Sequence, residues 1–127
     1  MTLNNDLFKI EKEDVIDGAH YSFTVSLNAG HLIYKAHFPR RPVTPGVIIL
    51  QIALELIEKQ TGLQPMVDNI NNVKFLSVIE PAETPVVVFS FVHEKGKVKC
   101  NVSTTEGKDL TKMSLTIKLF DLAKLMD

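Results

Sequence analysis

The fold is decided by residues 44–58, which read Thr44-Pro45-Gly46-Val47-Ile48-Ile49-Leu50-Gln51-Ile52-Ala53-Leu54-Glu55-Leu56-Ile57-Glu58. Threonine can cap a helix and proline suits the first helical position, so this stretch predicts a helix that starts at Thr44 and ends near Gly62. Because the helix is apolar almost all the way round, it is expected to be buried inside other structure. Its β-branched residues could also form a buried strand, but its length and its Thr-Pro start favour a helix.

Alternation of apolar and polar residues on both sides of this helix predicts β-strands. The pattern is clearest before the helix and near the C-terminus, where it has the period of a strand with one buried face. The predicted strands cover residues 20–28, 73–79, 86–92, 98–102 and 112–119. We therefore expect an α+β fold in which an antiparallel sheet wraps around one long central helix.

Length and composition indicate a single domain over residues 1–127. Hydrophobic residues make up 45% of the chain, charged residues make up 23%, and the formal net charge is −1. That charge gives no overall field for binding nucleic acid, and no stretch reads as a membrane span. A lone cysteine, Cys100, excludes an internal disulfide, and the first residues lack the pattern of a signal peptide, so a cytoplasmic protein is expected.

The segment before the helix is unusually rigid, because three prolines separate His37 from the helix. The imidazole is thereby held relative to a helix N-terminus, whose free N–H groups a ligand can approach at Gly46. A carbonyl that becomes enolate-like would be stabilised there. A lone histidine is more often structural than catalytic, so the residues alone leave both readings open.

Three polar residues, Gln51, Glu55 and Glu58, interrupt the apolar helix at spacings of four and three. This spacing places them on one face of the helix. Such a stripe marks either a solvent or subunit boundary or a functional group of side chains. The four histidines and single cysteine have no spacing that zinc sites use, and no phosphate-binding loop is present, so neither a metal nor another cofactor is expected.

The rigid segment and the helix resemble the signature of the 3-hydroxyacyl-[acyl-carrier-protein] dehydratases of fatty-acid synthesis, which have the hot-dog fold. The resemblance is dense over residues 31–83 and continues as a strand pattern to about residue 120. Several matched positions in a row make it more specific than an isolated motif. It is carried by His37-Phe38-Pro39, Arg41-Pro42-Val43, Pro45-Gly46-Val47, Lys74-Phe75 and Glu80-Pro81-Ala82-Glu83.

The resemblance implies an enzyme that converts 3-hydroxyacyl thioesters to trans-2-enoyl thioesters and water. In that family, a histidine at the position of His37 is the general base, and the amide at the position of Gly46 holds the thioester carbonyl. In the family, a carboxylic acid from the partner subunit's helix protonates the departing hydroxyl. The family thus predicts a homodimer, or a higher even-numbered oligomer, with its sites at the dimer interface.

The resemblance also implies the substrate and its carrier. Phe38 and Val47 are expected to contact the substrate, whose acyl chain lies in an apolar tunnel. The substrate arrives on the phosphopantetheine arm of acyl carrier protein, an anionic partner that would suit a patch at Arg40 and Arg41.

The chain departs from the family at its acid. The family's acidic residue falls on Gln51, whose amide cannot give up a proton at neutral pH. One turn later, Glu55 occupies a position where the family often has glutamine. We hypothesise that the two groups have exchanged places, so that Glu55 acts directly or through a water held by Gln51, because one turn of about 5.4 Å is a span that one water can bridge.

Three functions remain open from the sequence. The first is a dehydratase of the kind described above, in fatty-acid or related acyl-chain synthesis. The second is a hot-dog thioesterase in which Gln51 orients a water. The third is a subunit that binds acyl thioesters but is catalytically impaired by the loss of the usual acid.

Overall fold

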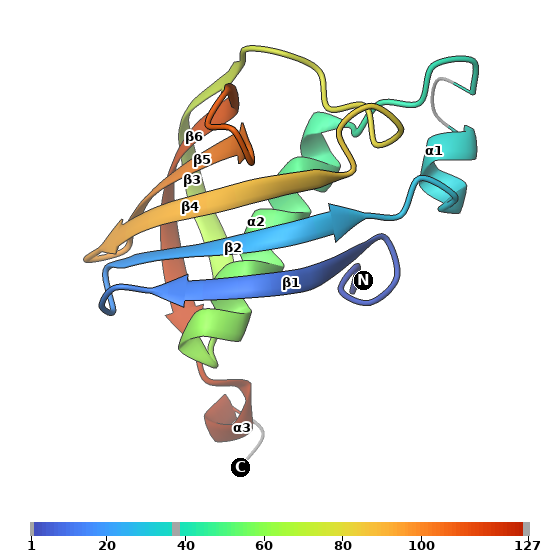
Figure 1. Ribbon diagram of the computed structural model, residues 1–127. Coiled ribbons are helices and arrows are strands. Elements are labelled where there is room, and N and C mark those ends of the chain that lie inside the picture. Colours follow the sequence, from blue (N-terminus) through green and yellow to red (C-terminus); the bar gives the residue numbers. More distant parts are fainter. Residues whose placement is uncertain (1, 37–38, 126–127) are drawn as a thin grey trace.

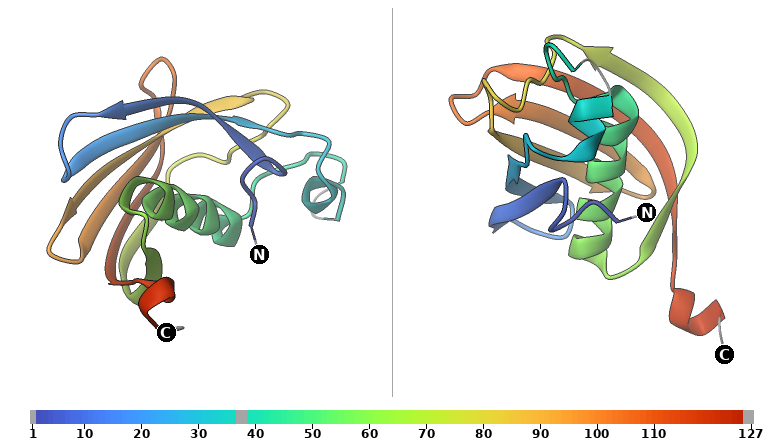
Figure 2. Two further views of the ribbon diagram at one scale, coloured as in Figure 1. Left: turned by 90° about the horizontal axis from the view of Figure 1, so that it is seen from below. Right: turned by 90° about the vertical axis from the view of Figure 1, so that its right-hand side faces the viewer.

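The protein is described here by a computed structural model that covers residues 2–36 and 39–125. Within these residues, six strands form one antiparallel sheet in the order β1-β2-β4-β5-β6-β3, and the sheet curves around helix α2 (Figures 1 and 2). The strands are β1 (Phe8–Val15), β2 (His20–Leu27), β3 (Gln64–Phe75), β4 (Val86–Glu94), β5 (Lys97–Thr104) and β6 (Asp109–Phe120). The helices are α1 (Leu32–Ala36), α2 (Gly46–Thr61) and α3 (Leu122–Leu125).

The core lies between α2 and the concave face of the sheet (Figure 2). In β2 and β4, every second residue over most of the strand is buried, as the alternation predicted. Three rings from these strands pack together, with Tyr21 stacked on Phe91 at a centroid distance of 5.1 Å and Phe23 edge-on to both. Burying each such side chain stabilises the fold by about 1.5–3 kcal/mol. The predicted antiparallel sheet around a central helix is confirmed.

The sequence predicted one end of α2 correctly and the other end incorrectly. The predicted C-terminus is confirmed, because Gly62 caps the helix in the left-handed conformation with φ 73° and donates its N–H to Glu58 O. The predicted N-cap is wrong. Pro45, not Thr44, is the N-cap, and Thr44 Oγ1 instead lies 2.9 Å from the buried hydroxyl of Tyr34. The Thr44 side chain, which the sequence suggested as the cap, thus forms a tertiary hydrogen bond with Tyr34 instead of capping the helix.

Only one side of α2 is fully buried, so the expectation of a helix buried all round is wrong for the single chain. Ile52 and Leu56 face the sheet with 1% and 0% exposure. On the other side, Val47 is 71% exposed, and Gln51 and Glu55 are half-buried. The sheet therefore leaves open the side that carries the polar stripe.

The two edge strands of the sheet are where the strand predictions fail. Strand β1 was not predicted, and β3 begins at Gln64 rather than at residue 73 and ends at Phe75, so residues 76–79 are not strand. Both strands pair on one side only, β1 with β2 and β3 with β6. Most of their side chains are exposed, so their sequences lack the apolar alternation by which a half-buried strand is recognised.

Candidate functional site

Two of the predicted site residues meet on the open side of α2. Gln51 Nε2 donates a hydrogen bond of 3.0 Å to Glu55 Oε2. Their spacing of one turn places them on one face, as the sequence indicated. They touch directly, so the water that the sequence hypothesis allowed between them is not needed to connect them.

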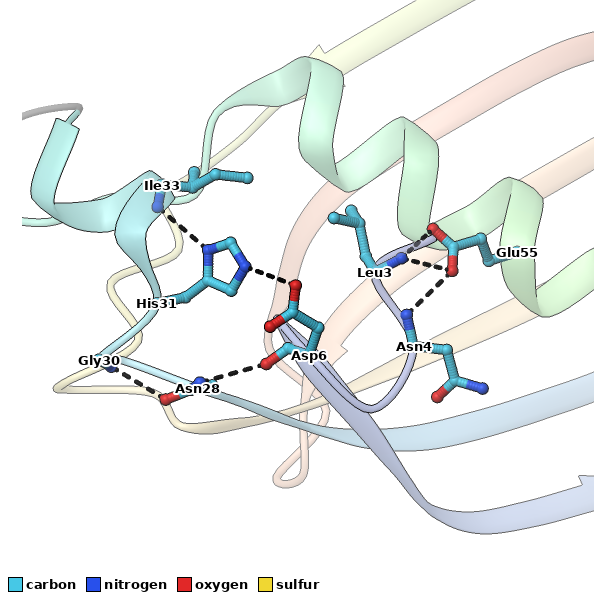
Figure 3. Close-up of polar contacts among 8 residues, drawn as sticks. All are labelled: Leu3, Asn4, Asp6, Asn28, Gly30, His31, Ile33 and Glu55. Carbon is cyan, nitrogen blue, oxygen red and sulfur yellow. Dashed lines mark hydrogen bonds and ion pairs between the residues drawn. The ribbon is translucent and has the colours of Figure 1, made fainter. Parts of the chain in front are cut away.

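The N-terminal segment completes the surroundings of Glu55. The backbone N–H of Leu3 lies 2.8 Å from each carboxylate oxygen of Glu55, and the N–H of Asn4 donates to Oε1 at 2.9 Å (Figure 3). Sequence reasoning missed these contacts. Their donors are backbone groups, which every residue except proline carries, so no residue type marks them.

A cavity of about 360 Å³ opens beside this pair. Its walls come from α2, from the N-terminal segment and from the start of β3. Its lining residues are Thr2, Asn4, Gln51, Glu55, Glu58, Lys59 and Gln64. Because these side chains are polar or charged, the cavity suits a hydroxyl or water near Glu55 better than an acyl chain.

The N-terminus of α2 is covered by an aromatic ring. A Cβ at Gly46 would lie 2.6 Å from Cζ of Phe75, so the ring lies directly against the glycine. Gly46 and Phe75 also line a cavity of about 160 Å³, together with Thr44, Ile49, Ser77, Val78 and Ile79. The absence of a side chain at Gly46 makes room for the Phe75 ring, and the approach of a ligand to the Gly46 N–H stays a prediction. Val47 is exposed beside it.

A larger apolar cavity of about 550 Å³ lies next to the segment that carries the predicted base. It is lined by Pro39, Arg40, Arg41, Val43 and Val78. His37 and Phe38, the predicted base and substrate contact, lie outside the described residues. Arg40 and Arg41, predicted to contact the carrier protein, lie at the wall of this apolar cavity.

The two arginines differ in their contacts. Arg41 forms an ion pair with Glu80, in which Nη2 and Nε each lie 2.5 Å from Oε1. Arg40 is exposed. Glu80 belongs to the turn after β3, so the ion pair ties that turn to the segment before α2.

Burial shifts the pKa of several titratable groups that do not line the cavities described above. Burial raises the pKa of the Cys100 thiol and that of Tyr21, the latter to about 12. Burial also lowers the pKa of His93, whose Nδ1 lies 3.2 Å from the Tyr21 hydroxyl. Among the described residues, no group of three or more His, Cys, Asp or Glu is arranged to hold a metal ion. Within the same residues, every helix is too short or too polar to cross a membrane.

Comparison with known proteins places most of the chain in one family. Residues 11–114 match the ApeI-like family, described as ApeI dehydratase. The chain is 31% identical over 72 residues to the 3-hydroxyacyl-[acyl-carrier-protein] dehydratase FabZ of Caldicellulosiruptor bescii, a match that spans 51% of each protein. It is 28% identical over 116 residues to FabZ of Lactococcus lactis subsp. cremoris, covering 83% of this chain and 81% of that one.

Solved structures show the same fold. The dehydratase heterocomplex ApeI:P from Xenorhabdus doucetiae superposes with a TM-score of 0.72 at 13% identity, covering 85% of this chain and 95% of that chain. A hypothetical thioesterase from Streptococcus pneumoniae TIGR4 superposes with a TM-score of 0.60 at 11% identity, covering 91% and 93%. The predicted hot-dog fold is therefore confirmed, and it is shared by proteins named for two different reactions.

Proposed function

Because the chain belongs to the ApeI-like dehydratase family, we propose that it converts (3R)-hydroxyacyl thioesters of acyl carrier protein to trans-2-enoyl thioesters. One observation carries the proposal. The carboxylate of Glu55 contacts Gln51 on the open side of α2, facing a polar cavity. The family's reaction needs a proton donor on this face, and Glu55 supplies a carboxyl group one turn from the family's usual position.

The proposed reaction eliminates one water. His37 takes a proton from the carbon next to the thioester, and the electron pair of that bond forms the new carbon–carbon double bond. The bond between the third carbon and its hydroxyl breaks, and a proton from Glu55 joins the leaving hydroxyl to give water. The N–H of Gly46 stabilises the negative charge that develops on the thioester carbonyl. Gln51 holds the Glu55 carboxyl group through its side-chain amide.

The two cavities suit different parts of the proposed substrate, one apolar and one polar. The apolar cavity beside Arg40 suits the acyl chain, and the polar cavity beside Glu55 suits the hydroxyl that leaves. Arg40 is the better candidate for the anionic carrier protein, because Arg41 already pairs with Glu80. In the proposed site, Phe38 and Val47 contact the substrate, as the resemblance implies.

The edge strand β3 supports a dimer. It pairs only with β6, and its Met66, Val67 and Ile70 are between 36% and 57% exposed. An apolar edge strand is a ready template for pairing with another strand. We propose that two copies pair along β3, so that His37 of one copy and Glu55 of the other serve one site.

A second candidate function is an acyl-thioester-binding subunit with little activity of its own. Two observations favour it: Gln51 replaces the family's acid, and both oxygens of Glu55 already accept hydrogen bonds. A substrate hydroxyl would have to compete with these N–H donors. The structurally similar ApeI:P assembly is described as a heterocomplex, which gives a precedent for two different subunits in this fold.

The test is to incubate the purified protein with 3-hydroxyacyl-carrier-protein thioesters of several chain lengths and to measure loss of water by mass spectrometry. We expect enoyl product, and we expect Glu55→Gln and His37→Ala each to lower its rate by about 10²–10⁴-fold, the usual contribution of an acid or base. Asp17→Ala, in the β1–β2 turn, is the control and should keep the wild-type rate.

The other outcomes separate the alternatives. An unchanged rate in Glu55→Gln would show that Glu55 is not the acid. Release of free thiol without enoyl product would indicate a thioesterase. Acyl-thioester binding without either product, together with a gain of dehydration in Gln51→Glu, would indicate the binding subunit, since that change restores the family's acid.

A further inference from the structure

Residues 3–7 form a tight turn that is anchored in the core. Leu3 is 1% exposed and Leu7 is 0% exposed. Within the turn, the N–H groups of Asp6 and Leu7 donate to Leu3 O at 3.0 and 2.9 Å, and Asn5 adopts the left-handed conformation with φ 66°. Two buried leucines and this hydrogen bonding fix the backbone of the turn relative to the sheet.

One side of the turn holds the carboxylate of Glu55. The N–H groups of Leu3 and Asn4 point to the same carboxylate, and Leu3 donates to both of its oxygens (Figure 3). Thr2 and Asn4 also form a wall of the polar cavity that Gln51 and Glu55 face. The turn therefore contacts the proposed acid and borders the space where that acid would act.

The other side of the turn is tied to helix α1. Asp6 Oδ2 lies 3.0 Å from Nε2 of His31, whose Nδ1 accepts the N–H of Ile33 in the first turn of α1 at 3.0 Å (Figure 3). Because Nδ1 accepts this hydrogen bond, it carries no proton. The ring N–H is therefore at Nε2, which donates a hydrogen bond to Asp6 Oδ2. Asn28 adds a second tie, because its side-chain amide donates to Asp6 O at 3.1 Å.

We propose that residues 3–7 are a positioning clamp for Glu55, in which Asp6 and His31 set the position of the backbone amides that hold the carboxylate. The inference rests on the proposed function of Glu55 as acid. A carboxyl group on the open side of a helix has several rotamers, and two fixed N–H donors restrict it to one. Asp6 and His31 thus influence catalysis through the clamp and are not themselves catalytic residues.

The first test compares two substitutions at Asn4. Asn4→Pro removes the backbone N–H that donates to Glu55, whereas Asn4→Ala removes the side chain and keeps that N–H. Loss of a hydrogen bond to a charged group is expected to lower kcat for dehydration in Asn4→Pro by about tenfold or more relative to Asn4→Ala, with KM changed much less. Equal kcat in the two variants would overturn the clamp.

The second test examines Asp6. In Asp6→Asn the side-chain oxygen can still accept from His31 Nε2, whereas in Asp6→Ala it is lost. We expect kcat to fall in Asp6→Ala and to be largely restored in Asp6→Asn. The matched control is Asp17→Ala, which removes the carboxylate of the Asp17–His20 pair, also 3.0 Å long but located in the β1–β2 turn. A fall in Asp17→Ala as large as in Asp6→Ala would refute a specific role for Asp6.

Hydrogen exchange tests the clamp without relying on activity. In Glu55→Ala, the amides of Leu3 and Asn4 lose their acceptor, so their exchange should speed up by about tenfold or more. Glu58→Ala, on the same helix, should leave their exchange unchanged. Unchanged exchange in Glu55→Ala would overturn the clamp even in an active enzyme. If exchange speeds up in Glu55→Ala but the wild-type protein neither dehydrates nor binds acyl thioesters, the proposed function is refuted and the contact between the turn and Glu55 stands.

Discussion

Glu55 and Gln51 occupy neighbouring turns of α2 in the order opposite to that of the family this sequence resembles. Their hydrogen bond of 3.0 Å keeps the carboxylate directed toward Gln51. The carboxyl group of Glu55 therefore lies within hydrogen-bonding distance of the side chain at position 51. The direct contact gives the proposed exchange of roles a physical basis, because the side chains reach toward the same point.

At the same scale, His93 gives a prediction for stability. Burial lowers the pKa of His93 in the folded chain, so the unfolded chain binds a proton more readily. Above the ordinary histidine pKa of about 6.5, His93 is neutral in both states and does not destabilise the fold. As the pH falls below this value, the unfolded chain binds the proton first, so the stability of the fold decreases until the pH reaches the lowered pKa of His93 in the folded chain. In urea unfolding at several pH values between about 7.5 and 5.5, His93→Gln should therefore lose less stability than the wild type. Parallel losses in the two proteins would show that His93 does not contribute.

At the scale of the element, Gly46 at the N-terminus of α2 both packs against Phe75 and has a proposed role in the reaction. The ring of Phe75 lies against Gly46 but is 59% exposed, so it has room to turn away. Glycine in a helix is less stable than alanine by about 1 kcal/mol, which offsets the cost of moving the ring. An alanine at position 46 is therefore expected to change stability little, whereas the proposed function needs access to the N–H of Gly46.

Gly46→Ala tests that distinction. Its melting temperature should stay close to that of the wild type, whereas dehydration should fall by about 10²–10³-fold, the usual effect of losing one donor to the developing oxyanion. The double variant Gly46→Ala with Phe75→Ala makes room for the new methyl group but still blocks the approach to the amide. Recovery of activity in that double variant would mean that displacement of Phe75, not the blocked amide, caused the loss.

At the scale of the whole molecule, the two edges of the sheet differ in character. Strand β1 carries charged residues such as Lys12 and Glu13, which discourage pairing with another strand. Strand β3 exposes apolar side chains, among them Ile70 at 50% exposure, and Val47 on the open side of α2 is 71% exposed. This asymmetry favours association along β3.

If the protein forms the proposed dimer, Ile70→Lys should convert it to a monomer, as measured by size-exclusion chromatography with light scattering. The same change should lower dehydration, because each proposed site needs two copies. Glu13→Lys, on the opposite edge, is the matched control and should leave the mass unchanged. A wild-type protein that is monomeric yet active would contradict the shared site.

Sequence patterns predicted those helices and strands in which the order of apolar and polar residues matches the burial that the structure shows. The apolar run of α2, its end at Gly62 and the alternation in β2 and β6 predicted the central helix and the inner strands. Resemblance in the segment before α2 predicted the family and the fold. The tertiary structure was needed to find β1 and most of β3, whose exposed residues carry no such alternation, and to find the pairing of Thr44 with Tyr34.

Tertiary structure alone also decided how Glu55 is held. The spacing of Gln51 and Glu55 placed them on one face, but the carboxylate of Glu55 also accepts hydrogen bonds from the backbone N–H groups of Leu3 and Asn4, some fifty positions away in sequence. A backbone donor is chemically the same in almost every residue, so no pattern of side chains reveals which ones a carboxylate will meet. The Leu3 and Asn4 amides contact Glu55 only because the fold packs the N-terminal turn beside α2, with Leu3 and Leu7 buried in the core.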